Sequence, residues 1–293
     1  MREKISEQAH MRLPEWIRTK SFSDIHNTKH ILRNHGLATV CEEARCPNIG
    51  KCFSKPTATF MILGSRCTRN CLFCSVESSM PEPVDPGEPE RLAAAAKEMG
   101  LKYVVITSVT RDDIPDGGAG HFAKTVYAIR KYLPCSKVEV LTPDFKGDIN
   151  ALKTVLLSGP DVYNHNVETI PKLYPLVRPR ADYRRSISLL AEARRIAPEM
   201  NTKSGLMLGL GETLNEVIDV LRDLRGTGCD IVTIGQYLRP SRMNLPVVEY
   251  IRPETFERIR LTASGMGFKY VASFPLARSS MNAEEMYNNG KAY

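Results

Sequence analysis

The segment Cys67-Thr68-Arg69-Asn70-Cys71-Leu72-Phe73-Cys74 carries three thiols with the spacing C-x3-C-x2-C. Thiolates are the ligands that iron–sulfur clusters take, and three of them can hold three corners of one cluster while the fourth corner has no protein ligand. An open coordination position is where a metal does chemistry rather than only stabilising a fold. The alternative is a zinc site, which needs a fourth ligand and usually contains two C-x2-C pairs.

A second triplet, Cys41, Cys46 and Cys52, precedes the first with the spacing C-x4-C-x5-C. Residues 57–63 lie between the two triplets, and their apolar and β-branched character predicts a buried strand. A strand of this length spans about 20 Å. We therefore expect the triplets at opposite ends of the strand, holding two separate clusters, with one binuclear zinc site as the alternative.

The length and composition fit a globular protein with a well-buried core. The chain has 293 residues, of which 42% are hydrophobic and 25% are charged. No apolar run approaches the roughly 20 residues that a membrane span needs. Residues 1–20 lack the apolar core of a secretory signal and contain acidic residues that transit peptides avoid. We therefore expect a cytoplasmic protein, in which a content of eight cysteines indicates metal binding rather than disulfides.

The net charge of +7 indicates either a solubilising surface or attraction to an acidic partner. Nucleic acid is not expected as that partner, because the chain has no low-complexity basic tail and no aromatic RNA-binding signature. Arg178, Arg180, Arg184 and Arg185 form a local basic patch. This patch is either solvated charge at a helix end or a site that recognises a carboxylate or an acidic partner.

From residue 57 onward, strand patterns alternate with helix patterns, which implies parallel strands joined by right-handed crossovers. Six such units are fewer than the eight of a closed TIM barrel. The predicted fold class is therefore α/β, with a partial (β/α)6 TIM-like barrel at 57–265 between an N-terminal extension at 1–56 and a C-terminal extension at 266–293. The six predicted strands of these units are 57–63, 103–107, 137–141, 162–166, 203–208 and 231–234, and residues 268–272 of the C-terminal extension are also apolar and strand-like.

Ligands of α/β barrels gather at the carboxyl ends of the strands, and polar residues follow most of the predicted strands here. Their convergence on one rim predicts an active site. Within this rim we expect His165 to be a structural hydrogen-bonding residue, with a catalytic base as the alternative. The isolated Cys135 and Cys229 are predicted to be small buried hydrophobic residues. The polar segments are 67–74, 108–113, 164–168, 209–213 and 236–237.

The 67–74 motif resembles the signature of the radical S-adenosylmethionine superfamily, and the two triplets together resemble the lipoyl synthase family. The similarity extends from about residue 14 to residue 281. The triplet at 41–52 separates this family from other radical enzymes. The tail departs from the family's Arg-Ser-Ser-Tyr motif at its last position, because Met281 follows Arg278, Ser279 and Ser280.

The resemblance implies a sulfurtransferase with two 4Fe–4S clusters and S-adenosyl-L-methionine. It implies that the reducing cluster cleaves S-adenosylmethionine to a 5′-deoxyadenosyl radical, and that the auxiliary cluster is consumed as the sulfur donor. Two sulfur atoms enter carbons six and eight of an octanoyl chain, which is amide-linked to a lysine of a carrier domain. Unactivated C–H bonds explain the radical, because no side-chain base can deprotonate them.

The resemblance also implies a role for each site residue. Ser280 is the fourth ligand of the auxiliary cluster, with Ser279 as the second choice. An oxygen ligand matches iron less well than a thiolate does, so it can leave and expose the cluster. The thiolate ligands of the reducing cluster are Cys67, Cys71 and Cys74, those of the auxiliary cluster are Cys41, Cys46 and Cys52, and the S-adenosylmethionine contacts are Thr107, Ser108, Asn166 and Glu168.

The implied partners are an octanoylated lipoyl carrier domain or protein, an electron donor such as ferredoxin or flavodoxin, and an iron–sulfur cluster carrier. Two other hypotheses remain open. Asn164-His165-Asn166 also resembles biotin-synthase-like enzymes, so another radical sulfur-inserting activity is one alternative. A zinc-stabilised basic nucleic-acid module is the other, and it predicts a colourless protein.

Overall fold

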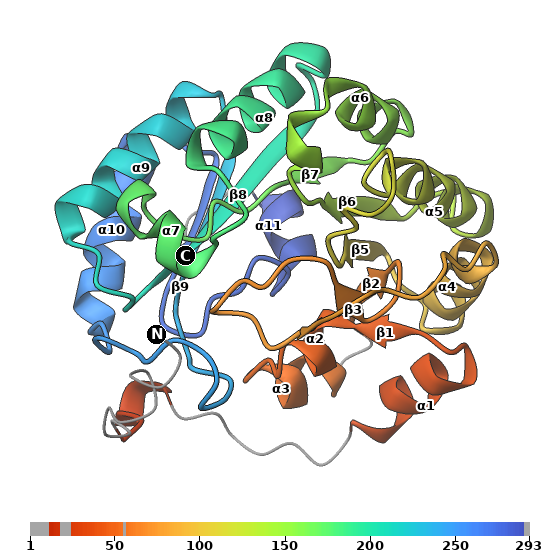
Figure 1. Cartoon of the computed structure of the whole chain (residues 1–293), viewed down its shortest axis with the longest axis horizontal. Helices are drawn as coiled ribbons and strands as arrows, with labels where there is room; N and C mark the ends of the chain where they lie inside the picture. The colour runs from red at the N-terminus through yellow and green to blue at the C-terminus, as the bar shows by residue number, and fades with distance from the viewer. Residues whose placement is uncertain (1–11, 18–24, 55–56, 290–293) are drawn as a thin grey trace.

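The computed structural model describes residues 12–17, 25–54 and 57–289 (Figure 1). Its centre is a sheet of eight strands in the order β1-β2-β5-β6-β7-β8-β9-β10. All neighbours are parallel except β1, which pairs antiparallel with β2. The strands are β1 Ala38–Thr39, β2 Thr59–Ile62, β5 Tyr103–Ser108, β6 Lys137–Leu141, β7 Val162–Asn164, β8 Asn201–Leu208, β9 Ile231–Gln236 and β10 Tyr270–Ser273.

Helices form a ring outside the strands, with each major helix packed on the next (Figure 1). Because helices cover the outside and side chains fill the inside, β2, β9 and β10 are buried along their whole lengths. The ring is α4 Glu88–Glu98, α5 Ala119–Tyr132, α6 Ile149–Leu157, α8 Tyr183–Ile196, α9 Leu214–Gly226 and α10 Pro253–Gly265.

Shorter elements decorate this frame at its ends and rim. A pair of two-residue strands, β3 and β4, forms a separate sheet beside the first cysteine motif. These elements are η2 Glu15–Ile17, α1 His26–Asn34, α2 Val40–Glu43, α3 Ile49–Phe53, β3 Arg66–Cys67, β4 Glu77–Ser78, η3 Phe145–Gly147, η4 Pro171–Leu173, α7 Tyr174–Val177 and α11 Ala283–Asn289.

The six predicted strands all form, and the partial-barrel prediction is confirmed. The sheet is nevertheless larger than six strands, because each predicted extension adds one. Ala38 of β1 pairs with Met61, and Tyr270 of β10 pairs with Ile231. The extensions are therefore continuous with the barrel sheet, and β1 and β10 are its two edges.

The C-terminal helix α11 lies inside the ring of strands (Figure 1). Met286 packs on Ile231 and Tyr270, and the ring of Tyr287 lies 5.9 Å from that of Tyr103. These partners begin β9, β10 and β5, so α11 covers the N-terminal end of the barrel. The segment between β10 and α11 therefore runs along the barrel interior, from the rim toward the opposite end. Across the described ranges, no helix combines the length and apolarity needed to cross a membrane.

Candidate active site

The first cysteine motif is fastened to the barrel rim by backbone hydrogen bonds. The amide of Thr68 donates to the carbonyl of Thr110 at 3.0 Å, and that of Leu72 donates to Val177 at 3.0 Å. The sulfur of Cys67 accepts hydrogen bonds from the amides of Arg69 at 3.4 Å and Thr110 at 3.3 Å. Amides aimed at a sulfur stabilise a thiolate and tune a bound iron–sulfur cluster, so this donor set fits such a cluster.

Arg69, between the first two thiols, is an anchor that sequence reasoning missed. Its side chain is 4% exposed and bonds Asp112 through Nε at 2.8 Å and Asp144 through Nη2 at 2.6 Å. Burial alone would raise the pKa of the Asp144 carboxyl, but its bond and charge interaction with Arg69 outweigh burial and lower that pKa. The sequence shows a basic residue inside the motif and acidic residues at 112–113, but it does not show that they pair.

The second triplet is shaped by two short helices. Thr39 caps α2 by accepting from the amide of Glu42, and the amide of Cys46 donates to the carbonyl of Cys41 at 3.0 Å. The thiols of Cys41, Cys46 and Cys52 lie close enough to interact electrostatically. Burial raises the pKa of the Cys41 thiol to about 12. Metal binding must therefore displace a proton from this buried thiol.

Both triplets border one cavity of about 370 Å³, within the range of ~300–1,000 Å³ that is typical of ligand sites. Cys74 of the first motif and all three cysteines of the second triplet line it. In the described part of the chain, no three His, Cys, Asp or Glu side chains lie close enough to bind a single metal ion.

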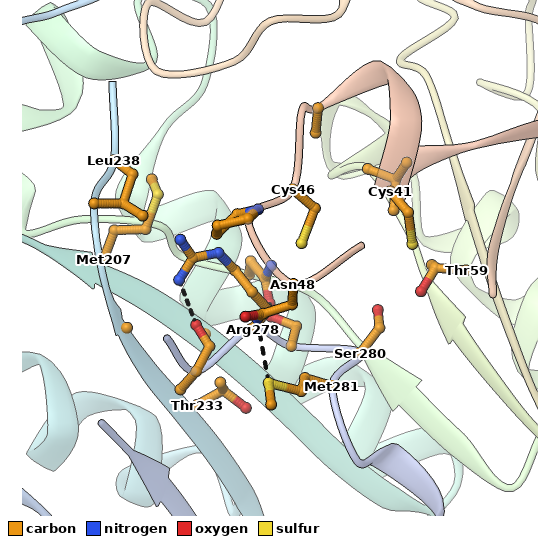
Figure 2. Close-up of a pocket in the computed structure, with 18 of the residues that line it drawn as sticks. Cys41, Cys46, Asn48, Thr59, Met207, Thr233, Leu238, Arg278, Ser280 and Met281 are labelled. Carbon is orange, nitrogen blue, oxygen red and sulfur yellow. Dashed lines mark hydrogen bonds between the residues drawn. The ribbon is translucent and has the colours of Figure 1, made fainter. Parts of the chain in front are cut away.

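The C-terminal tail also lines this cavity (Figure 2). Asn48, buried within the second triplet, donates through Nδ2 to the carbonyl of Leu276 at 2.7 Å and to Sδ of Met281 at 3.2 Å. Met281 is thus packed in place despite its departure from the family motif. Ser280 makes no hydrogen bond to any described residue and points toward the side where Cys41 lies (Figure 2).

The guanidinium of Arg278 lies in the same cavity without a carboxylate partner. Its one hydrogen bond to a described residue runs from Nη1 to the carbonyl of Ala277 at 2.6 Å, and it forms no ion pair there. It is close enough to Cys46 and Glu168 to interact with both electrostatically. An unpaired cation facing a thiol triplet fits an anionic occupant.

The four predicted S-adenosylmethionine contacts divide into two pairs. Asn166 and Glu168 line the cavity, and burial raises the pKa of the Glu168 carboxyl. Glu168 also adopts a left-handed backbone with φ of 67°, which is uncommon for this residue type. Thr107 and Ser108 do not line the cavity. The hydroxyl of Thr107 donates to the carbonyl of Leu141 at 3.0 Å, whereas the buried hydroxyl of Ser108 has no partner among described residues.

The predicted basic patch does not form one surface. Arg178 turns inward and donates to the carbonyl of Asn166 at 3.0 Å. Arg180 donates to the carbonyl of Thr68 at 2.7 Å, and Arg185 pairs with Asp144 at 3.2 Å. Three of the four arginines therefore hold the rim together, because each finds an acceptor on a neighbouring segment.

The surroundings of His165, Cys229 and Cys135 test three predictions about single residues. His165 is buried, with Nδ1 bonded to the carbonyl of Thr142 at 2.9 Å and Nε2 to the hydroxyl of Ser186 at 3.0 Å, which confirms its structural role. Burial lowers its pKa to about 4, so the ring is neutral at pH 7. Cys229 is buried as predicted, but the prediction for Cys135 is wrong, because its loop before β6 leaves it exposed.

Two family models match the chain. The model of the radical SAM superfamily matches residues 61–224, and that of the N-terminal domain of lipoyl synthase matches residues 1–46. The chain is 54% identical to the lipoyl synthase of Caldanaerobacter subterraneus subsp. tengcongensis, over 94% of this chain and 96% of that protein. It is 53% identical to the lipoyl synthase of Methylococcus capsulatus, over 96% of this chain and 88% of that protein.

Solved structures show the same fold at low identity. Methylornithine synthase superposes with a TM-score of 0.56 at 15% identity, covering 85% of this chain and 75% of that one. A maturase of the [FeFe]-hydrogenase gives a TM-score of 0.57 at 15% identity, covering 91% and 60%. Given the sequence identity along nearly its whole length, the chain belongs to the lipoyl synthase family of radical S-adenosylmethionine sulfurtransferases.

Proposed function

We propose that the chain builds the lipoyl group with two four-iron clusters that have different tasks. The observation that supports this proposal is the shared cavity, which Cys74 lines together with the second triplet and Ser280. A substrate carbon in this cavity would lie between the site that generates a radical and the site that supplies sulfur. When bound to the two triplets, the reducing cluster with S-adenosylmethionine would supply the radical and the auxiliary cluster would supply the sulfur.

On the reducing side, Cys67, Cys71 and Cys74 hold the cluster and leave one coordination position open. Asn166 and Glu168 bind S-adenosylmethionine, an assignment supported by their place in the cavity and by the hydrogen bond between their side chains. The free hydroxyl of Ser108 is available for the same ligand, whereas Thr107 acts through the sheet, because its hydroxyl is already bonded.

On the auxiliary side, Cys41, Cys46 and Cys52 hold three corners and Ser280 the fourth. Three thiolates and a cluster of four irons leave a net negative charge, which Arg278, without an ion pair to any described residue, offsets. The three regions of the chain then have distinct tasks. Residues 57–265 bind the reducing cluster, while 1–56 and 266–293 together hold the auxiliary one, and the bonds from Asn48 to the tail support this pairing.

The substrate is an octanoyl-lysine presented by a carrier domain, and the largely apolar lining of the cavity suits an alkyl chain. The electron donor is ferredoxin or flavodoxin, and an iron–sulfur carrier restores the consumed cluster. A cytoplasmic location fits this chemistry, because free thiols and exposed clusters persist only under reducing conditions.

The test is a single turnover with an octanoyl-lysine peptide at equal iron content. Ser280→Ala should cleave S-adenosylmethionine normally but lose most of the lipoyl product, and Ser280→Cys should also lose product because a thiolate leaves iron less readily. Ser279→Ala is the matched control and should keep making product. Normal product from Ser280→Ala together with loss of product in Ser279→Ala would identify Ser279 as the ligand. Normal product from both variants would show that the tail supplies no ligand.

A further inference from the structure

Two glycines of the barrel wall lie directly beneath the C-terminal tail. Gly205 lies in β8 and Gly235 in β9, and both line the cavity that the tail enters. Neither has the positive φ that requires glycine in a turn. Their lack of a side chain therefore needs another explanation, and the close approach of the tail supplies it.

Gly235 allows the tail backbone to touch the strand. A β-carbon built at this position would lie 2.2 Å from the carbonyl oxygen of Ala277 and 3.0 Å from Nη1 of Arg278. The first of these is a backbone atom, which cannot rotate away. The tail also bonds to this strand, because the amide of Gln236 donates to Pro275 at 2.9 Å and the amide of Phe274 donates to Ile234 at 3.2 Å.

Gly205 makes room for the side chain of the next residue along the tail. Its β-carbon would lie 2.7 Å from Oγ of Ser279 and 2.9 Å from Oδ1 of Asn166. In that space the hydroxyl of Ser279 donates to Oδ1 of Asn166 at 3.0 Å. This bond turns Ser279 toward β8 and occupies its hydroxyl. Ser280, the next residue, has no hydrogen bond within the described part of the chain and points toward the side of the second triplet (Figure 2).

We propose that Gly205 and Gly235 are positioning residues that form a seat for residues 277–280 and thereby determine which serine faces the auxiliary triplet. The seat fixes the register of the tail: Ala277 lies on Gly235, Ser279 lies on Gly205, and Ser280 is presented to Cys41, Cys46 and Cys52. This inference rests on the proposed role of Ser280 as a ligand, but the seat itself is a property of the apo-protein and can be tested separately.

The first test compares Gly235→Ala with Gly226→Ala in the full chain. Gly226 ends α9, and an added β-carbon there would meet nothing within 4 Å, so this variant is the matched control. In Gly235→Ala, trypsin should cleave the apo-protein after Arg278 about tenfold faster or more, because cleavage follows the population of the open form. Mass spectrometry identifies the bond that is cut. Equal cleavage of this bond in both variants and in the native chain would overturn the seat.

Gly205→Ala gives a second test if Gly235→Ala fails to fold. Protection of the bond after Arg278 should fall in Gly205→Ala and recover in part in Gly205→Ala/Ser279→Gly, because the second change removes the nearest atom, Oγ of Ser279, while Oδ1 of Asn166 ends a side chain that can rotate away. No recovery in the double variant, or no loss in the single one, would contradict the proposed contact.

Reconstituted protein then links the seat to the cluster. Gly235→Ala should retain the iron and the S-adenosylmethionine cleavage of the reducing site and, like Ser280→Ala, should lose most of the lipoyl product at equal iron content, which a general loss of stability would not produce. Normal lipoyl product despite faster trypsin cleavage would refute the link between seat and ligand. Native protein with only the reducing cluster would instead refute the proposed function, and the cleavage result on the apo-protein would still decide the seat.

Discussion

Replacing Arg69 by methionine tests how the first cysteine motif is held in place. The change keeps much of the apolar stem and removes the guanidinium, leaving Asp144, whose side chain is 0% exposed, without its strongest partner. Removing one partner of a buried ion pair costs about 3–5 kcal/mol, because the remaining charge stays desolvated. Arg185 stays near Asp144 at 3.2 Å and keeps the expected loss toward the lower end of that range.

Arg66→Met is the matched control, because Arg66 lies in the same segment but its side chain is 43% exposed. Its contacts to Glu77 at 3.5 Å and Glu82 at 3.6 Å are surface pairs, worth about 0–1 kcal/mol. The assay is urea unfolding of the anaerobic, reduced apo-protein, read as the free energy of unfolding. Equal losses in the two variants would refute the view that Arg69 anchors the motif.

The pH dependence of unfolding tests independently whether Asp144 causes the loss of stability. In the native chain the pKa of Asp144 is lowered, so its stabilising contribution is present at neutral pH and is lost only as pH falls below the usual carboxyl range. In Arg69→Met the burial of this carboxyl is less opposed, so its pKa rises and protonation relieves the cost. The difference in the free energy of unfolding between Arg69→Met and the native protein should therefore be smaller at pH 5 than at pH 7. Arg69→Met/Asp144→Asn should recover most of the loss at pH 7, and a failure to recover would exclude Asp144 as the cause.

Three further predictions follow from the same geometry. Cys67→Ala should abolish cleavage of S-adenosylmethionine, whereas Cys46→Ala should keep that cleavage and lose lipoyl product; equal loss of cleavage in two folded variants would contradict the division of tasks. Asn48→Ala removes both bonds to the tail and should lower stability by about 1 kcal/mol or more, since it leaves the part-buried carbonyl of Leu276 without this donor; urea unfolding measures this loss, and an unchanged free energy of unfolding would show that these bonds do not hold the tail. Arg184→Glu should slow association with an acidic carrier at low salt, because Arg184 is exposed and steering by surface charge is screened over about 8 Å at physiological ionic strength; a salt-independent association rate would show that it is only solvated charge.

The barrel was predictable because its signals are local. Alternating apolar segments and helix-ending glycines such as Gly100, which has a φ of 66°, lie within a few residues of the elements they define. The two edge strands differed in how visible they were. β1 has only two residues, too few for a strand pattern, whereas β10 falls within the apolar segment 268–272, whose strand-like character is local. The pairing of each strand at an edge of the sheet was not predicted.

The sequence predicted those residues of the site that are recognisable as ligands by their type. Thiols at short spacing identify metal-binding segments, because few other roles place three cysteines so close together. Asn48 and Arg69 act through partners 228 and 75 residues away, and one sequence does not display such pairs. For the same reason the arginine patch divided: the guanidiniums of Arg178, Arg180 and Arg185 each bond to an acceptor that only the folded rim brings near, whereas Arg184 is exposed.

Iron and sulfide analysis of anaerobically reconstituted protein tests the central claim of two clusters most directly. The native chain should bind about eight irons and about eight sulfides, since each 4Fe–4S cluster holds four of each. The Cys41/Cys46/Cys52 triple alanine variant should retain about half of both and still cleave S-adenosylmethionine. Native protein with about four irons, or a triple variant with unchanged iron, would contradict the claim that the second triplet holds an auxiliary cluster.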